Sequence, residues 1–436
     1  MIVNIGLIGF GTVGSGVYDL IMQNACLIKE RTGLDLRIKT VCDIRTEDVK
    51  KKVGSINVIN DWRDVITDKE IDTVVELIGG ISPAKSIILE SLKNGKNVVT
   101  ANKKLLAEDG DEIFNTAGMS NSKLGFEASV GGGMPCILSL KYGLVGTRIN
   151  TVIGILNGTT NYILTKMEDE GLTFEMALKD AQDKGFAEAD PTFDIEGFDA
   201  GHKIALLSML AYNRKVDFKS ISIDGITKIN QLDIEYAKEM GYVIKLLGIS
   251  KLIGDEVDIR VHPAMLPMDH PLASVRNEFN AVMYITDMTG PVILYGKGAG
   301  NHPTASAVVS DIVQIARDTV KDDKALTASI DSKYLSSEKR LFRFYMRLST
   351  EDRPGILSKI SGVLAKYDIS IASVIQKEIH TKNPDSKNVP LVIMTHVACE
   401  DKMLRSIDEI NNFNFVEGKV TFIKVEDSLS LGDEYE

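Results

Sequence analysis

Short apolar runs alternate with amphipathic stretches over roughly the first 130 residues. Each run is short enough for one buried strand, and the stretches between the runs can form helices. The runs are Val3–Ile8, Ile38–Cys42, Asp72–Ile78, Lys96–Thr100 and Lys123–Ala128. Strands that alternate with helices predict βαβ units and a mostly parallel sheet. We therefore expect an α/β protein whose first domain, residues 1–130, is a doubly wound parallel sheet.

The pattern becomes mixed beyond residue 130. Helices are expected at Tyr162–Glu170, at Phe174–Gly185 and from Thr304 to about Val320, and strands at Thr151–Leu156 and Val257–Pro263. A glycine-rich loop, Gly296–Gly300, precedes the last helix. These elements predict an α+β domain over residues 131–320. The charged, serine-rich stretch that follows predicts a linker over residues 321–340.

The C-terminal part has the pattern of a compact α+β unit. Phe342, Phe344, Met346 and Leu348 alternate with other residues, which is typical of a half-buried strand. A turn at Asp352–Gly355 then leads into a helix with an apolar face. Two strands, a second helix and a last strand follow, so the order is βαββαβ. We expect a ferredoxin-like domain over residues 341–427.

Composition narrows the class of partner. The chain has 436 residues, 44% of them hydrophobic, and a net charge of −11. An acidic chain without a basic stripe repels nucleic acid and anionic membranes, so neither is an expected partner. The apolar runs are too short for a membrane span, and no secretory signal is visible. The scattered Cys26, Cys42, Cys136 and Cys399 favour a reduced, cytoplasmic protein. With nucleic acid and membranes set aside, a small polar metabolite is the expected partner.

The first predicted strand leads directly into a G-x-G-x-x-G motif. Gly9, Gly11 and Gly14 enclose Thr12 and Val13, and a helix follows. In this motif the glycines permit a tight turn, close approach of a pyrophosphate, and close packing of helix on strand. Amides at the helix N-terminus then bind the phosphates. We expect a Rossmann-type domain that binds a dinucleotide through these residues, with a merely structural turn as the alternative.

Two residues after the second strand bear on the choice between NAD and NADP. Asp43 could accept hydrogen bonds from the adenosine ribose, which favours NAD. Arg45 could instead meet a 2′-phosphate, and Asp43 lies further from Gly14 than the usual ~20 residues. Both cofactors stay open, with NAD as the first choice.

Lysines mark two further places where chemistry is expected. Thr100 and Lys103 follow the fourth strand, at the sheet edge where open α/β folds bind ligands. In the stretch Gly185–Lys203, five acids precede Lys203, and Asp199 lies one helical turn before it. This favours a cleft with a tuned amine, and an ordinary salt-bridged lysine is the alternative. The six histidines show no metal-ligand spacing, so we expect surface or core roles for them.

The combination of motifs resembles the homoserine dehydrogenase family, in the form with a C-terminal ACT domain. The resemblance is carried by Gly9–Gly14, Thr100–Lys103, Glu127–Pro135, Gly154–Tyr162, Gly185–Lys203, Gly298–Asp311 and Asp352–Leu357. The stretches Gly154–Tyr162 and Gly185–Lys203 are the most specific. Because the chain begins at the Rossmann strand, the resemblance implies a monofunctional enzyme without an attached kinase.

The resemblance implies an activity and a site. The reaction would be the NAD(P)-dependent interconversion of L-aspartate 4-semialdehyde and L-homoserine, in threonine, methionine and isoleucine biosynthesis. Lys203 would be the catalytic lysine, and Lys103 a second lysine near nicotinamide and substrate. The implied substrate-binding acids are Glu188, Asp194 and Asp199, and further implied cofactor contacts are Thr100 and Gly300. A structural sodium ion would be held mainly by backbone oxygens of Glu127, Val130, Gly132 and Met134.

The resemblance also implies assembly and regulation. Residues 131–320 would form the catalytic and dimerisation domain of a homodimer or homotetramer. The ACT domain implies allosteric feedback inhibition by threonine. Gly355 would lie near the effector, because glycine lets backbone amides face a ligand. A dimerisation module without a ligand is the alternative.

The expected chemistry agrees with these residue types. Hydride arriving at an aldehyde carbon leaves negative charge on oxygen, which a nearby ammonium group stabilises and protonates. We expect Lys103 and Lys203 to lower each other's pKa, and Glu188 to be the first choice for gripping the substrate's α-ammonium. Two other classes stay open. One is a Rossmann dehydrogenase for 2-hydroxy acids, which would favour a catalytic histidine. The other is a non-enzymatic sensor of NAD(H) or of an amino acid.

Overall fold

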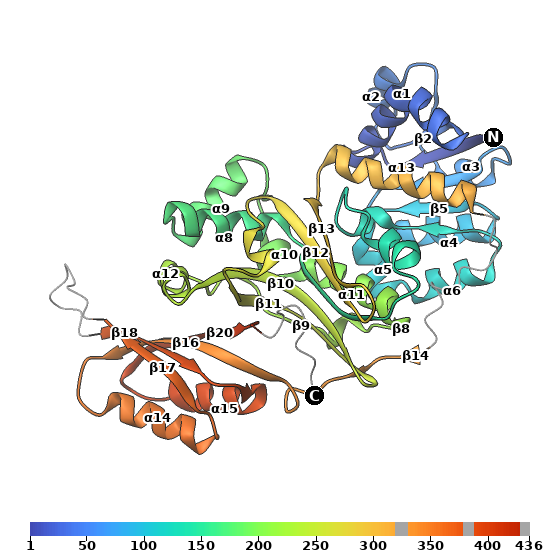
Figure 1. Ribbon diagram of the computed structural model, residues 1–436. Helices are drawn as coiled ribbons and strands as arrows, with labels where there is room; N and C mark the ends of the chain where they lie inside the picture. The colour runs from blue at the N-terminus through green and yellow to red at the C-terminus, as the bar shows by residue number, and fades with distance from the viewer. Residues whose placement is uncertain (319–329, 378–387, 428–436) are drawn as a thin grey trace.

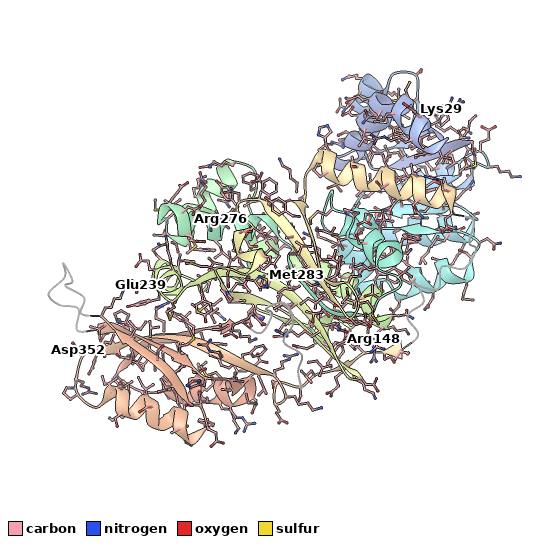
Figure 2. The ribbon with its side chains drawn as sticks, viewed as in Figure 1. Lys29, Arg148, Glu239, Arg276, Met283 and Asp352 are labelled. Atoms are coloured by element: carbon pink, nitrogen blue, oxygen red, sulfur yellow. The ribbon has the colours of Figure 1, made fainter. Side chains whose placement is uncertain are left out.

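The structure of the chain, a computed structural model, describes residues 1–318, 330–377 and 388–427. An N-terminal α/β domain, a central α+β domain and a C-terminal domain follow one another across the molecule (Figure 1). Met283 lies near the middle, whereas Lys29 and Asp352 lie toward opposite ends (Figure 2). No helix among the described residues is long and apolar enough to cross a membrane. The cysteines are all free thiols.

The N-terminal sheet is parallel throughout, with the strand order β3-β2-β1-β4-β5-β6. Its strands are β1 Ile2–Ile8, β2 Asp35–Cys42, β3 Asn57–Ile59, β4 Thr73–Glu76, β5 Asn97–Thr100 and β6 Leu124–Gly125. Its helices are α1 Thr12–Thr32, α2 Thr46–Val53, α3 Trp62–Thr67, α4 Ala84–Lys93, α5 Lys103–Asp109 and α6 Asp111–Met119. The predicted Rossmann-type sheet is confirmed. Because the strand order reverses between β1 and β4, the ligand crevice lies at the carboxyl ends of these strands.

Helix α13, Asn301–Arg317, packs on this first domain although it comes late in the chain. It lies beside α1 (Figure 1), and Ala305, Val308 and Ile312 join the apolar cluster of the N-terminal sheet. Gly16 permits the close approach, since a Cβ there would lie 1.8 Å from the Asn301 Oδ1 atom. We therefore count α13 with the first domain, whereas the sequence pattern placed it in a second domain ending at residue 320.

The central domain is built on an antiparallel run of strands, β13-β12-β7-β10-β11. These strands are β7 Ile149–Ile155, β10 Tyr242–Ile253, β11 Glu256–Pro267, β12 Phe279–Thr286 and β13 Gly290–Lys297, with short β8 Arg214–Lys215 and β9 Ser222–Ile223. The helices are α7 Cys136–Leu138, α8 Gly158–Glu170, α9 Phe174–Asp183, α10 Thr192–Ile195, α11 Phe198–Tyr212 and α12 Gln231–Glu239. Buried side chains of α11 pack against β7, β10 and β11. This packing fixes α11 beside the carboxyl end of β7.

The C-terminal domain has the predicted βαββαβ order. Its elements are β16 Leu341–Glu351, α14 Ile356–Lys366, β17 Ile371–Gln376, β18 Asn388–Thr395, α15 Glu400–Asn411 and β20 Val416–Val425, with short β19 Ala398–Cys399. The antiparallel strand order β20-β16-β18-β17 is that of a ferredoxin-like fold. Strand β20 also pairs in parallel with β11, where Lys424 lies opposite Ala264. The two sheets are therefore continuous.

Part of the expected linker over residues 321–340 forms strands. Strand β14, Ile330–Asp331, pairs with β8, and β15, Lys333–Tyr334, pairs with β11. The beginning of the expected linker lies outside the described residues.

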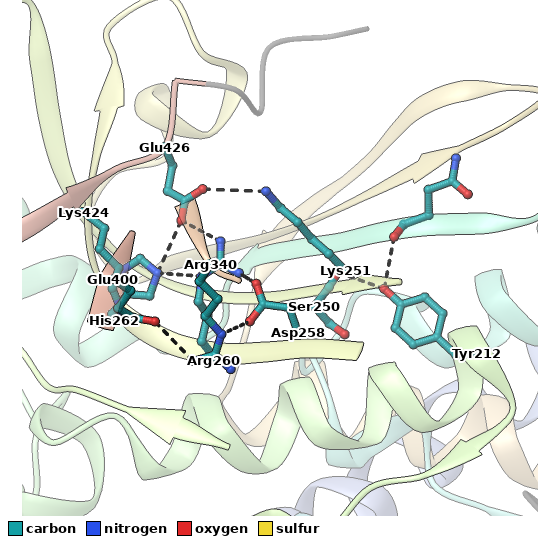
Figure 3. A network of polar contacts seen from close by, with 11 residues as sticks. Tyr212, Ser250, Lys251, Asp258, Arg260, His262, Arg340, Glu400, Lys424 and Glu426 are labelled. Carbon is teal, nitrogen blue, oxygen red and sulfur yellow. Dashed lines mark hydrogen bonds and ion pairs between the residues drawn. The ribbon is translucent and has the colours of Figure 1, made fainter. Parts of the chain in front are cut away.

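Buried charges also hold the C-terminal domain to the central one (Figure 3). Arg260 on β11 donates from Nη2 to Glu426 Oε1 at 2.7 Å and pairs with Asp258. The Nε atom of Arg340, just before β16, lies 2.8 Å from the second oxygen of Asp258. All four side chains are at most one-tenth exposed. The two domains therefore share one buried ionic network.

Candidate active site

The glycine loop between β1 and α1 has the geometry that a dinucleotide needs. Gly9 has a φ of +95°, and a Cβ there would lie 2.7 Å from the carbonyl carbon of Leu77. A Cβ on Gly14 would lie 2.1 Å from the Gly9 oxygen, so helix and turn pack closely. A Cβ added to Gly11, in contrast, would meet no described residue within 4 Å apart from its chain neighbours. Space is thus left for a pyrophosphate at the start of α1, which no side chain caps.

Three further residues predicted to contact the cofactor, Thr12, Val13 and Gly300, lie beside this loop. Thr12 and Val13 are the first two residues of α1, where amides have no partner within the helix. Gly300 directly precedes α13, and its φ of +113° is a conformation that favours glycine. Because Asn301 touches Gly16 on α1, Gly300 lies close to the first turns of that helix.

Asp43 and Arg45 form an ion pair against the glycine loop. Asp43 Oδ2 accepts a hydrogen bond of 2.7 Å from the Phe10 amide, and Arg45 donates one of 3.0 Å to the Phe10 carbonyl. Burial by itself raises the pKa of Asp43, but hydrogen bonds from Arg45 and from two amides outweigh it, and the pKa is lowered. The Asp43 side chain is 8% exposed and that of Arg45 57%. Arg45 is therefore the exposed member of this pair beside the glycine loop.

Thr100 lies beside a buried acid, Glu76, that the sequence prediction did not single out. The Thr100 hydroxyl donates to Glu76 Oε2 at 2.7 Å, at the carboxyl ends of two neighbouring strands. Glu76 also accepts from the amides of Ile78 and Gly79, and burial raises its pKa. Glu76 therefore shapes the turn next to the ligand crevice. An acid at the end of an apolar run is the sequence signal that could have identified it.

Lys103 is placed by a capped helix. Asn102 is the N-cap of α5: its side chain accepts from the Leu105 amide at 3.2 Å and donates to the Gly80 carbonyl at 2.6 Å. Lys103 is consequently the first residue of α5, and α5 packs against α11 of the central domain. This packing brings Lys103 to the helix that carries Lys203.

The carboxylate of Asp199 holds both lysines. Its Oδ2 accepts from Lys203 Nζ at 2.7 Å, and its Oδ1 lies 3.0 Å from Lys103 Nζ. Lys203 also donates to the Leu156 carbonyl at 2.5 Å, at the end of β7. Asp199 and Lys203 are 4% and 6% exposed. Burial acts to raise the pKa of Asp199, but Lys203 and Lys103 outweigh it and hold that pKa well below its usual range.

The pKa of Lys103 is raised, which contradicts the expectation that the two lysines lower each other's pKa. The charge of Asp199 is the largest cause and outweighs burial, and the charges of Asp194 and Glu188 add to it. The expectation was wrong for Lys103 because it did not include a carboxylate shared between the two cations.

Asp194 belongs to the same cluster, and Glu188 lies at its edge. Asp194 Oδ1 accepts from the side chain of Asn157 at 2.7 Å, and burial and the charge of Asp199 raise its pKa. Glu188 is exposed, and its charge is the smallest of the named causes that act on the pKa of Lys103. The structure thus brings the two lysines and the two aspartates together and leaves Glu188 on the rim.

His202 is a core residue, as expected. Its ring stacks on Phe218 and Phe193 at centroid distances of 4.2 and 5.3 Å, and Nε2 lies 2.7 Å from Glu108. Burial lowers its pKa. The described residues contain no group of three or more His, Cys, Asp or Glu side chains that could hold a metal.

The loop predicted to hold sodium is a tight turn with two buried acids beside it. Gly132 has a φ of +56°, and Val130 and Met134 are buried on the same turn. The Glu127 carboxylate accepts from two amides near the start of α7, and the Glu127 backbone oxygen accepts from the Val130 amide at 3.1 Å. Burial raises the pKa of Glu127 to about 7 and that of Asp311 well above its usual value; Asp311 accepts from the Glu127 amide at 2.8 Å. This concentration of buried acids fits a cation.

A parallel sheet with a dinucleotide-type glycine loop, next to two lysines held on one buried carboxylate, fits a nicotinamide-dependent oxidoreductase. Three family models agree: "Homoserine dehydrogenase, NAD binding domain" matches residues 9–127, "Homoserine dehydrogenase" residues 135–313, and "ACT domain" residues 344–414. The chain therefore belongs to the homoserine dehydrogenase family, and it is an NAD(P)-dependent oxidoreductase with a C-terminal ACT domain.

Relatives that match over nearly their full length support the same family assignment. The chain is 42% identical to a homoserine dehydrogenase of Neisseria gonorrhoeae over 97% of this chain and 98% of that protein. It is also 42% identical to one of Helicobacter pylori, over 97% of this chain and 99% of that protein. The crystal structure of a homoserine dehydrogenase from Thiobacillus denitrificans superposes with a TM-score of 0.91 at 39% identity, covering 98% of this chain and 99% of that one.

Proposed function

We propose that this chain catalyses the NAD(P)-dependent interconversion of L-aspartate 4-semialdehyde and L-homoserine, a step toward threonine, methionine and isoleucine. The observation that carries the proposal is the pair of lysines held on Asp199 where the N-terminal and central domains meet. A nicotinamide cofactor supplies the hydride when bound, and the residues that fit it are the glycine loop, Arg45 and Thr100.

Lys203 is proposed as the group that protonates the substrate oxygen. An ammonium group has three N–H donors. Two of them are directed at Asp199 and at the Leu156 carbonyl, which leaves a third for a substrate oxygen. Asp199 and Leu156 thereby fix the direction of this proton. Negative charge that develops on the oxygen is stabilised by Lys203 and by the neighbouring Lys103.

The acids bind the amino group of the substrate in this proposal. Asp194 is half-buried in the cluster, and Glu188 stands on the rim. The exposed Glu188 and the half-buried Asp194 would attract the α-ammonium group of the substrate. Binding of this group would orient the aldehyde toward Lys203. Asp199 is already shared by two lysines, so we assign it the role of positioning them.

The test is a spectrophotometric assay of nicotinamide reduction with L-homoserine, run with NAD and with NADP. Homoserine-dependent reduction supports the proposal. Turnover of a 2-hydroxy acid in place of homoserine would support the first rival class. Cofactor binding without turnover of either compound would support a sensor.

We propose that NADP is accepted through Arg45. The Asp43 carboxylate is used by the Phe10 amide and by Arg45, whereas Arg45 is exposed beside the glycine loop. A guanidinium group there suits a 2′-phosphate. A mutant of a hyperthermophilic archaeal homoserine dehydrogenase, 28% identical over 72% of this chain, was crystallised with NADPH. This geometry favours NADP over NAD. The sequence pattern had favoured NAD, because Asp43 was expected to bind the adenosine ribose.

We further propose that threonine binds the ACT domain and inhibits the enzyme. A cavity of about 350 Å³ is lined by residues 350–357 together with Gln376 and Leu391. Gly355 is the N-cap of α14, with a φ of +91°, and no side chain caps this helix. The uncapped amides suit the carboxylate of an amino acid. Titrating threonine against activity tests this, and a flat curve up to millimolar concentrations would leave the domain a structural role only.

Two smaller proposals concern the sodium ion and the assembly. A sodium ion on backbone oxygens of Glu127, Val130, Gly132 and Met134 should raise the melting temperature relative to a choline buffer. A homodimer or homotetramer is supported by the edge strand β13, which exposes Ile293 and Tyr295. Sedimentation of the full chain measures the number of subunits.

A further inference from the structure

Asn157 occupies the corner where β7 leads into α8, inside the acid–lysine cluster. It directly follows Leu156, whose carbonyl oxygen accepts from Lys203. Asn157 is 5% exposed, so its side-chain amide needs partners within the protein. Those partners are the two aspartates of the cluster.

The amide nitrogen of Asn157 bridges these aspartates. Nδ2 donates to Asp194 Oδ1 at 2.7 Å and to Asp199 Oδ2 at 2.8 Å. A primary amide has two N–H groups, so one nitrogen can serve both carboxylates. Carboxylates this close repel each other, and hydrogen bonds to their charged forms offset the repulsion.

The amide oxygen fixes the orientation of the bridge. Oδ1 accepts from the Thr160 amide at 2.8 Å and from the Thr160 hydroxyl at 3.0 Å, which makes Asn157 the N-cap of α8. Because the oxygen is committed to the helix, the NH₂ group must face the acids. Serine could also cap α8 but is too short to reach both carboxylates, and aspartate could cap it but has no N–H to donate.

We propose that Asn157 is a positioning residue that holds Asp194 and Asp199 side by side, so that Asp194 meets the α-ammonium of the substrate while Asp199 holds the lysines. This inference rests on the proposed homoserine dehydrogenase function and deepens it. With Oδ1 bound to Asn157, the second oxygen of the half-buried Asp194 is the one that an ammonium group would meet.

The experiment compares Asn157→Ser and Asn157→Asp with the wild type. Homoserine oxidation is followed across pH, and NADPH binding is followed by fluorescence. We expect kcat/KM for homoserine to fall about 10- to 100-fold, mainly through KM, since hydrogen bonds to charged groups are lost. The acidic limb of the kcat/KM profile should move to higher pH, because Asp194 loses a donor to its charged form. NADPH affinity should stay unchanged.

Asn230→Ser is the matched control, because Asn230 is likewise an N-cap but serves α12, away from the cluster. It should keep wild-type kinetics. Folded Asn157 variants with wild-type kcat/KM and an unmoved acidic limb would overturn the inference. An equal loss in Asn230→Ser, or a parallel loss of NADPH affinity, would show a general structural effect and also overturn it. A wild type that does not oxidise homoserine would instead refute the proposed function, and the inference with it.

Discussion

Lys103 and Asp199 form an ion pair that joins two domains. Lys103 is the first residue of α5 in the N-terminal domain, and its Nζ lies 3.0 Å from Oδ1 of Asp199 in the first turn of α11. The other oxygen of the same carboxylate holds Lys203. The geometry of both lysines, and the pKa of Lys103, therefore depend on one acid.

Replacing Asp199 by asparagine removes the charge that raises the pKa of Lys103. Burial then acts with less opposition, so the pKa of Lys103 falls. For reduction of the semialdehyde we expect kcat/KM to fall about 100-fold or more and its basic limb to move to lower pH. Asp183→Asn is the control, because Asp183 pairs with Lys179 on the surface. A basic limb that stays in place would contradict the role given to Asp199.

Replacing Arg45 by alanine should weaken NADPH more than NADH. The guanidinium is the exposed member of the pair with Asp43 and is placed to meet a 2′-phosphate. We expect KM for NADPH to rise about 10-fold or more, as for loss of a charge-assisted hydrogen bond, with a smaller change for NADH. Arg63→Ala, an exposed arginine on α3, should change neither value. Equal losses for both cofactors would refute the assignment.

Lys245 makes stability depend on pH. Its buried Nζ donates to the Val275 carbonyl at 2.6 Å and to Asn161 Oδ1 at 3.2 Å, and burial lowers its pKa from 10.5 to about 8. Between these values the unfolded chain binds more protons than the folded one, so stability rises with pH there. Lys245→Met should flatten this rise by up to about 1.4 kcal/mol per pH unit in urea unfolding. The exposed Lys179→Met should keep the wild-type slope, and an unaltered slope in Lys245→Met would contradict the assignment.

Glu426 should stabilise the seam between the central and C-terminal domains. Burial acts to raise its pKa, but Arg260, Lys251 and His262 outweigh it and lower that pKa well below its usual value. Its contribution is therefore present above the unfolded pKa and is lost as pH falls toward the folded one. Glu426→Gln should cost about 3 to 5 kcal/mol of unfolding free energy near neutral pH, since it leaves buried cations without their partner. Glu417→Gln, on the exposed part of β20, should lower the unfolding free energy far less. Losses of similar size in the two variants would contradict the role given to Glu426.

The local part of the fold and site could be predicted from sequence, because its signals lie within a few residues of each other. The glycine motif and apolar runs predicted the parallel sheet, and the four-residue spacing predicted that Asp199 and Lys203 would meet. Lys103 also reaches Asp199, but that contact depends on α5 packing against α11. Spacing alone could not show it, and this is why the pKa of Lys103 was predicted in the wrong direction.

Other features depend on contacts that no local pattern records. Strand β10, Tyr242–Ile253, was not predicted: it is buried along most of its length, and Lys245 and Lys251 interrupt its apolar pattern. The sequence pattern placed helix α13 in the second domain. Its contact with Gly16 joins distant parts of the chain, so no local pattern could show that α13 packs on the first domain. Asn157 was seen only as part of a family motif, since its two acids lie 37 and 42 residues further along the chain.

The central claim, that Lys203 protonates the substrate oxygen, is tested most directly by Lys203→Met in semialdehyde reduction. Lys179→Met is the matched control, because Lys179 also pairs with an aspartate four residues away but on the surface. We predict that kcat and kcat/KM of Lys203→Met both fall about 100- to 10,000-fold while NADPH affinity stays unchanged. Near wild-type kcat in a folded Lys203→Met protein would contradict the account.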